Sequence, residues 1–254
     1  MELGLTRDAV VDVVEGRIGR VAVLQSNYIP WKGYFDIIND VDLFVFYDDV
    51  QYTKNDWRNR NKIKTAGGVR WLSIPAGEAH HRLIHEVELT DSRWQEQHWA
   101  TLCQNYRRCA HFGRYQDYFE SVYLGERWAN LSALNQALIR HISTEFLGVK
   151  TTFADSRSYQ ASGAKLDRLV DLVVKTNASA YVSGPAAKAY VDPSRFSDLG
   201  VELIWKDYSG YPEYPQRFPP FEHGVSILDL LFNVGPDSSW YIWGWRNRPG
   251  GPAA

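Results

Sequence analysis

The chain has 254 residues, of which 44% are hydrophobic, and its 28 Lys and Arg against 30 Asp and Glu give a net charge of −2. That length fits one domain with an appended lobe, and the charge balance argues against a protein that coats nucleic acid, although it allows a local basic strip. Without a signal-peptide core, a long apolar run or a metal-binding cysteine spacing, we expect a cytoplasmic protein with no metal centre.

The first half of the chain begins with an alternation of strand and helix. Residues 1–19 are expected to form an N-terminal extension ahead of the domain. An apolar run at 21–24 predicts a strand, and the spaced apolar residues from Phe35 onward predict a helix after a tight turn. A second buried strand is predicted at 43–47, and Gly67 and its neighbours predict a hairpin turn further on.

The second half returns to strands after a helical lobe that is predicted over residues 91–147. Because strands alternate with helices, we expect an α/β fold: a parallel-rich sheet with flanking helices, Rossmann-like and nucleotidylyltransferase-like, with a helical insertion and a small antiparallel hairpin. This single domain is expected to span residues 20–235, followed by a C-terminal tail at 236–254. The later strands are predicted at 151–153, 180–183 and 201–205, with a helix at 164–175.

Polar and aromatic side chains follow the first predicted strand. In such sheets, ligands bind beyond the carboxyl ends of the strands, where helix N-termini offer free N–H groups. The loop therefore predicts a binding site, although a helix capped by Asn27 with aromatic rings in the core would also explain it. The candidate substrate-binding residues of this loop are Gln25, Asn27, Tyr28, Trp31 and Tyr34.

A basic strip follows the second strand. Residues two apart share one face of an extended segment, so Arg58 through Lys64 would present a cationic row. Phosphate or carboxylate is the natural partner of such a row, and an exposed edge strand guarded by charges is the alternative. The candidate substrate-binding residues here are Gln51, Lys54, Arg58, Asn59, Arg60 and Lys62.

Two carboxylates end the second strand, and they can hold Mg²⁺, orient an amine or act as a general base. The alternation of the preceding residues predicts that Asp48 and Asp49 point to opposite sides of the sheet. We assign the catalytic role to Asp49, which lies nearer the polar loop, and keep Asp48 as the second candidate. His98 is a third catalytic candidate, although a packed helix histidine is the alternative.

A second strand-to-helix turn carries small residues and a lysine. Ser183 can cap the helix, Gly184 permits a close backbone approach, and Lys188 follows one turn later. The turn is compatible with phosphate binding, but the spacing of a P-loop is absent.

The order of these motifs resembles the WbqC-like family from about Val21 to about Gly235. The resemblance adds Asn105 and Tyr106 to the candidate binding residues. The segments that carry it are Gln25–Phe35, Phe44–Lys54, Asn59–Lys64, His98-Trp99, Asn105-Tyr106, Tyr181–Pro185 and Ser226–Asn233.

The resemblance implies a transferase or ligase that forms an amide by joining glycine, or a related acyl group, to an amine of a sugar or small metabolite. Genes of this family occur among those for bacterial surface-polysaccharide and secondary-metabolite biosynthesis, which is the setting that the resemblance implies. The implied partner is a phosphorylated or nucleotide-linked small molecule, with aminoacyl-tRNA as an alternative acyl donor. A non-catalytic protein that binds a nucleotide sugar or a partner enzyme is the competing hypothesis. Leu24 and Ser26 stand where the family usually has His and Pro.

A second resemblance concerns position alone. Trp31-Lys32-Gly33-Tyr34 takes the place of the H-x-G-H loop of nucleotidylyltransferase-like enzymes, some of which activate carboxylates as acyl-adenylates. This likeness implies ATP and Mg²⁺ as candidate cofactors, although Trp31 and Tyr34 replace both histidines.

Overall fold

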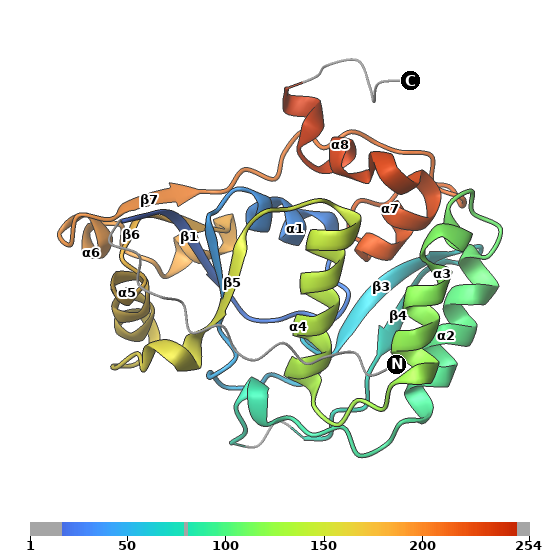
Figure 1. The fold of residues 1–254 in the computed structure, drawn as a ribbon, viewed down its shortest axis with the longest axis horizontal. Helices are drawn as coiled ribbons and strands as arrows, with labels where there is room; N and C mark the ends of the chain where they lie inside the picture. The colour runs from blue at the N-terminus through green and yellow to red at the C-terminus, as the bar shows by residue number, and fades with distance from the viewer. Residues whose placement is uncertain (1–16, 79–80, 248–254) are drawn as a thin grey trace.

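A five-stranded parallel sheet forms the centre of the protein in the computed structural model, which describes residues 17–78 and 81–247 (Figure 1). The strand order is β5-β2-β1-β6-β7, and each neighbouring pair runs parallel. The expected α/β fold is therefore confirmed. The strands are β1 (Ile18–Leu24), β2 (Leu43–Phe46), β5 (Thr152–Asp155), β6 (Ala178–Ser183) and β7 (Glu202–Trp205).

The two faces of the sheet pack against different helices because side chains alternate along each strand. Phe44 and Phe46 of β2 belong to a large core with α1 (Lys32–Asn39), α4 (Leu131–His141) and α7 (Ile227–Val234). On the opposite face, the odd-numbered residues of β1 and β2 pack against α5 (Lys165–Lys175) and α6 (Ser194–Ser197).

The insertion between β2 and β5 contains the predicted hairpin and the predicted helical lobe. The hairpin pairs β3 (Arg60–Thr65) with β4 (Gly68–Ser73) in antiparallel register, and its turn lies where glycines were expected. The lobe consists of α2 (Arg93–Tyr106), α3 (Phe112–Glu120) and then α4, which crosses back to the sheet. Figure 1 shows α2 and α3 on the far side of α4 from α5.

The two ends of the domain differ from the expected bounds, and residues 1–16 and 248–254 of the predicted extension and tail lie outside the described residues. β1 begins at Ile18, inside the predicted extension, because its backbone pairs with Ala178 of β6. At the other end, α8 (Ser238–Ile242) packs on α7, and Ile242 is fully buried in the core. The chain from 236 to 242 therefore belongs to the folded domain.

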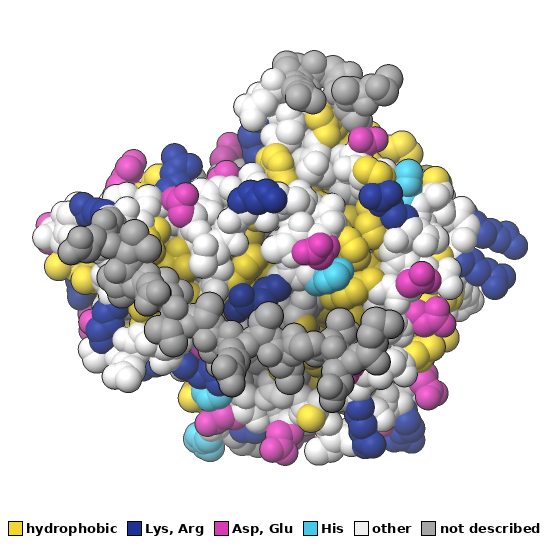
Figure 2. Space-filling view, viewed as in Figure 1, with side chains coloured by type: hydrophobic (Ala, Val, Ile, Leu, Met, Phe, Trp, Pro, Cys, Tyr) yellow, Lys and Arg dark blue, Asp and Glu magenta, His cyan; other side chains and the backbone are white. Residues whose placement is uncertain are grey.

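The surface carries charges of both signs. Figure 2 shows basic and acidic side chains scattered over one face, with hydrophobic side chains reaching the surface beside α4. Among the described residues, none of the helices is long and apolar enough to span a membrane.

Candidate functional site

A pocket of about 680 Å³ lies at the carboxyl ends of β1 and β2, on the face that α5 covers. The sheet order reverses between β1 and β6, and such a switch point is the usual ligand site of an open α/β sheet. The volume is in the range of small-molecule sites. The polar and tyrosine side chains that line it are Gln25, Asn27, Tyr47, Asp49, Gln51, Arg58, Lys165, Arg168, Tyr181 and Tyr190.

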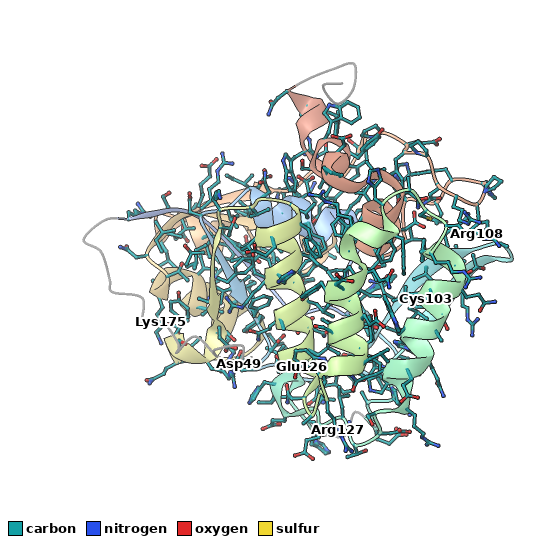
Figure 3. The ribbon with its side chains drawn as sticks, turned by 45° about the vertical axis from the view of Figure 1, so that its right-hand side comes forward. Asp49, Cys103, Arg108, Glu126, Arg127 and Lys175 are labelled. Atoms are coloured by element: carbon teal, nitrogen blue, oxygen red, sulfur yellow. The ribbon has the colours of Figure 1, made fainter. Side chains whose placement is uncertain are left out.

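Asp49 faces this pocket and is held by two donors. Ser156 Oγ donates to one carboxylate oxygen at 2.5 Å, and an Arg168 guanidinium nitrogen donates to the other at 2.5 Å. The Asp49 side chain keeps 10% of its surface exposed. Figure 3 shows Asp49 at the end of the sheet near α5, apart from Cys103 on α2.

Asp48 points to the other side of the sheet, as the alternation along β2 predicted. It is fully buried and accepts the Ser26 backbone N–H at 2.8 Å, together with the Ser132 hydroxyl and the Gln136 amide of α4. These donors tie the loop after β1 to α4. Asp48 is therefore a buried anchor and does not line the pocket.

The Ser26 bond gives a physical meaning to one departure from the family pattern. A proline at position 26 has no N–H to donate, so the bond to Asp48 is available only because this chain carries a different residue. Leu24, which stands in place of the family histidine, lines the pocket. That position therefore faces the candidate site, and in this protein it contributes an apolar wall.

Three cations surround the pocket, and two of them are paired. The Arg58 guanidinium contacts Asp56 and the Gln25 side chain, and Arg168 pairs with Asp49. Within the described part of the chain, Lys165 has no ion pair and lines the mouth of the pocket. The pocket-lining charges thus favour an anionic ligand group.

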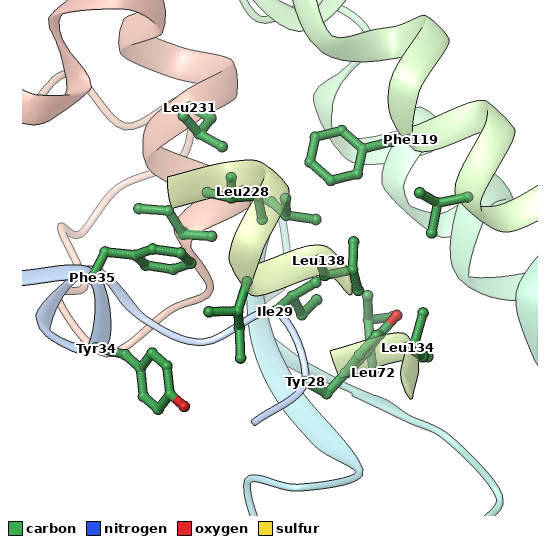
Figure 4. Packing of buried hydrophobic residues seen from close by; sticks show 14 of the residues in the cluster. Tyr28, Ile29, Tyr34, Phe35, Leu72, Phe119, Leu134, Leu138, Leu228 and Leu231 are labelled. Carbon is green, nitrogen blue, oxygen red and sulfur yellow. The ribbon is translucent and has the colours of Figure 1, made fainter. Parts of the chain in front are cut away.

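One residue of the loop from Gln25 to Trp31 is held in an unfavourable backbone conformation. Ile29 has a φ of 36°, in a left-handed region that β-branched residues rarely adopt. Its strain is offset by Asn61 of β3, whose side-chain amide donates to the Tyr28 and Ile29 carbonyls at 3.0 and 2.9 Å. Figure 4 shows Tyr28 and Ile29 pointing into the core near Leu134.

Tyr28 and His98 form a buried network in that core instead of lining the pocket. The Tyr28 hydroxyl lies 2.9 Å from His98 Nδ1 and 2.6 Å from the Tyr123 hydroxyl. His98 is 5% exposed, and burial lowers its pKa from 6.5 to about 4. The ring is therefore neutral near neutral pH. Of the two alternatives for His98, a catalytic residue or a packed helix histidine, its position fits the packed histidine.

We expect His98 to make the protein less stable in acid. The unfolded chain takes up a proton as the pH falls through 6.5, whereas the folded ring stays neutral down to about 4. Stability is therefore complete above pH 6.5 and falls by about 3 kcal/mol as the pH drops to 4. Denaturant unfolding over this range should show a smaller loss in His98→Gln, and equal losses would contradict the prediction.

The basic strip does not form one row. Arg58 lines the pocket, whereas Lys64 is buried and its ammonium donates to the Pro220 carbonyl. Lys54 pairs with Glu78 at 2.5 Å. Within β3, Arg60 and Lys62 share the less buried face, as parity predicted, but Lys64 of the same parity is buried against the loop from 207 to 225. The remaining members lie elsewhere on the hairpin: Arg60 and Lys62 over the indole of Trp71, and Asn59 buried with its amide on the Ile74 carbonyl.

The aromatic residues of the first loop are supports. The Tyr34 hydroxyl donates to the Gln25 carbonyl at 2.9 Å, and this bond holds the backbone of Gln25, whose side chain lines the pocket. Trp31 packs against Tyr208, with ring centroids 5.3 Å apart, and is not among the pocket-lining residues. The positional likeness to the H-x-G-H loop therefore brings neither replaced histidine position into the pocket.

The remaining candidates lie away from the pocket lining. Ser183 ends β6 beside β1, and Gly184 faces Tyr208. Lys188 lies over the Trp205 ring, with its ammonium 5.6 Å from the centroid. Two residues are in α2: Asn105 donates to the Thr101 carbonyl, and Tyr106 donates to the buried Asp229 at 2.8 Å.

Sequence reasoning missed the part of the site that comes from the second half of the chain. Lys165 and Arg168 stand three residues apart on α5, a spacing that puts both on one helix face. That spacing was the available signal, but it is also typical of a solvated helix surface. Three pocket-lining tyrosines were missed as well, because the sequence does not distinguish them from the aromatic residues of the core: Tyr47, Tyr181 and Tyr190.

The donor set argues against a magnesium ion held by the protein. Magnesium prefers carboxylate, phosphate and water oxygens. Asp49 is the one carboxylate among the pocket-lining residues, and Arg168 already pairs with it, while Asp48 faces α4. Phosphate groups of a ligand would instead meet the basic side chains directly.

These features define an α/β protein with an open parallel sheet and a polar pocket at its switch point. The chain belongs to the WbqC-like protein family, whose model matches residues 25–241. It is 46% identical over 226 residues to the uncharacterized protein Rv1507c of Mycobacterium tuberculosis, a match that covers 88% of this chain and 97% of that protein. No solved structure matches the chain.

Proposed function

We propose that the protein forms an amide bond in this pocket, as a transferase or ligase that joins an aminoacyl group, such as glycyl, to an amine of a sugar or small metabolite. The observation that carries the proposal is the lining of the pocket, which combines the carboxylate of Asp49 with Arg58 and an unpaired Lys165. An acceptor amine needs an acidic neighbour, and a phosphorylated or nucleotide-linked substrate needs basic ones. We place the reaction in surface-polysaccharide or secondary-metabolite biosynthesis, following the family resemblance.

Amide formation replaces the bond from the acyl carbon to its leaving group with a bond to nitrogen, and the amine loses one proton. Asp49 is fixed by Ser156 and Arg168 but keeps free lone pairs toward the pocket. It orients the amine and accepts that proton. Arg58 and Lys165 bind the phosphate of the substrate, and Gln25 and Asn27 donate hydrogen bonds to charge that develops on oxygen.

The leaving group identifies the acyl donor: a thioester releases a thiol, an aminoacyl-tRNA releases the tRNA hydroxyl, and an acyl-adenylate releases AMP. The test incubates the purified protein with amino acids and amino sugars, together with ATP, an aminoacyl thioester or an aminoacyl-tRNA. Mass spectrometry then looks for the amide, and nucleotide analysis looks for AMP or ADP. If every donor gives no amide while a nucleotide sugar still binds, the protein is a binding protein instead, a reading that the apolar Leu24 wall favours.

Lys165→Gln is expected to weaken binding of a phosphorylated ligand by roughly tenfold or more, because one charge-assisted hydrogen bond is lost. The side chain is exposed, so the fold should be unaffected. Titration calorimetry with a nucleoside diphosphate sugar measures the change. Lys175→Gln is the matched control: it removes the same charge from the other end of α5, where Lys175 pairs with Asp171 at 3.0 Å. Equal effects in both variants would contradict a specific contact.

A further inference from the structure

The outer face of the β3–β4 hairpin is a second basic surface, distinct from the pocket lining. Residues 57–77 contain five Lys and Arg and no Asp or Glu. Arg58 lines the pocket, Lys64 is buried and Arg70 pairs across from the buried Ile63, which leaves Arg60 and Lys62 on the outer face. The inner face of the hairpin is buried through Asn61, Ile63 and Leu72. Three residues of the opposite parity are less buried and face outward: Arg60, Lys62 and Trp71.

Two tryptophans are exposed on this outer face. Trp57 is 42% exposed and Trp71 is 39% exposed, and both are large apolar side chains that burial would normally cover. Their ring centroids lie 5.3 Å apart, with an angle of 39° between the planes. Two neighbouring indoles on the outer face therefore keep part of their surface open to a ligand.

Two cations with no ion-pair partner among the described residues lie over these rings. The Arg60 guanidinium lies 4.3 Å from the Trp71 centroid, and the Lys62 ammonium lies 5.2 Å from the same centroid and 5.8 Å from that of Trp57. Within the described part of the chain, neither cation has an acidic partner, and Arg60 Nε is buried without a hydrogen-bond acceptor. A ligand that supplies both anionic oxygens and flat rings would satisfy this surface.

We propose that Trp57, Trp71, Arg60 and Lys62 form a binding surface for single-stranded nucleic acid. Stacked bases on aromatic rings, with phosphates on nearby Arg and Lys, are the general basis of such binding. Neutral saccharides also stack on indoles, but they would leave the charges of Arg60 and Lys62 without an anionic partner. The surface is small, so it would hold a few nucleotides of a strand end or loop.

The test is fluorescence anisotropy of the full-length protein with a labelled single-stranded RNA of about 12 nucleotides, which is longer than the few nucleotides that the surface would hold. We expect binding that weakens with salt, a loss of roughly tenfold in affinity for Trp71→Ala through lost stacking, and a salt slope smaller by about 0.7 for Lys62→Gln. Arg93→Gln removes an exposed cation from α2 that is paired with Asp91, and it should bind like the wild type. Because Trp71→Ala could loosen the hairpin, Lys62→Glu, which keeps both indoles, is measured beside it.

The proposal fails if the wild type does not bind the RNA, or if the hairpin variants bind as tightly as Arg93→Gln. It also fails if an acidic polysaccharide binds to the hairpin and the RNA does not, since that assigns the surface to the other polymer. The assay contains no acyl donor or acceptor. Its outcome is therefore independent of the amide chemistry proposed for the pocket.

Discussion

Asp49→Asn is expected to lower the rate of amide formation by about 100-fold or more while leaving ligand binding largely intact, the usual range for loss of a proton acceptor. The amide keeps the shape of the carboxylate and can still accept from Ser156, but it cannot take a proton. The change also releases Arg168 from its ion pair, so the pocket becomes more positive. Affinity for a phosphorylated substrate should therefore hold or rise slightly.

The measurement separates turnover from binding: rates come from the mass-spectrometric amide assay and affinities from calorimetry. A fall in rate at constant affinity marks an interaction that matters in the transition state. Asp171→Asn is the control, because it neutralises a carboxylate of α5 that pairs with Lys175 on the helix surface. Full activity of the Asp49→Asn protein would reject the proposed role of Asp49.

Asp36→Asn should reduce the free energy of unfolding by about 3–5 kcal/mol, because it removes the fully buried carboxylate from an ion pair with the buried Lys206. Asp36 is fully buried in α1, where Lys206 lies 2.8 Å from one carboxylate oxygen and Arg246 lies 2.9 Å from the other. The Tyr211 hydroxyl donates to the same group. This single carboxylate thus joins α1 to the chain after β7 and to the residues after α8.

Asp40→Asn provides a matched comparison, since Asp40 pairs with the same Lys206 at 2.5 Å but its side chain is 36% exposed. Its loss should cost no more than about 1 kcal/mol because water screens the pair. Denaturant unfolding of both variants at neutral pH makes the measurement. Losses of similar size would show that burial does not determine how much each of these ion pairs contributes to the free energy of unfolding.

Local pattern was enough to predict the strands, the hairpin and the opposite directions of Asp48 and Asp49. Each of these follows from periodicity or from turn residues within a few positions. The pairing of Asp49 with Arg168 joins residues 119 positions apart, and no local pattern reports it. Parity also predicts which residues share a face of a strand, but not which part of the chain covers that face. Lys64 was therefore predicted to lie in one row with Arg60, although its ammonium is buried and donates to the Pro220 carbonyl.

Asn61 has a consequence that reaches beyond holding the strained turn at Ile29. One side chain of the hairpin fixes the carbonyls of the loop that supplies Gln25 and Asn27 to the pocket. A ligand that displaced β3 would therefore disturb the hydrogen bonds that hold the pocket loop. By reciprocity, such a coupling would act with the same factor in the opposite direction, from the pocket to the hairpin.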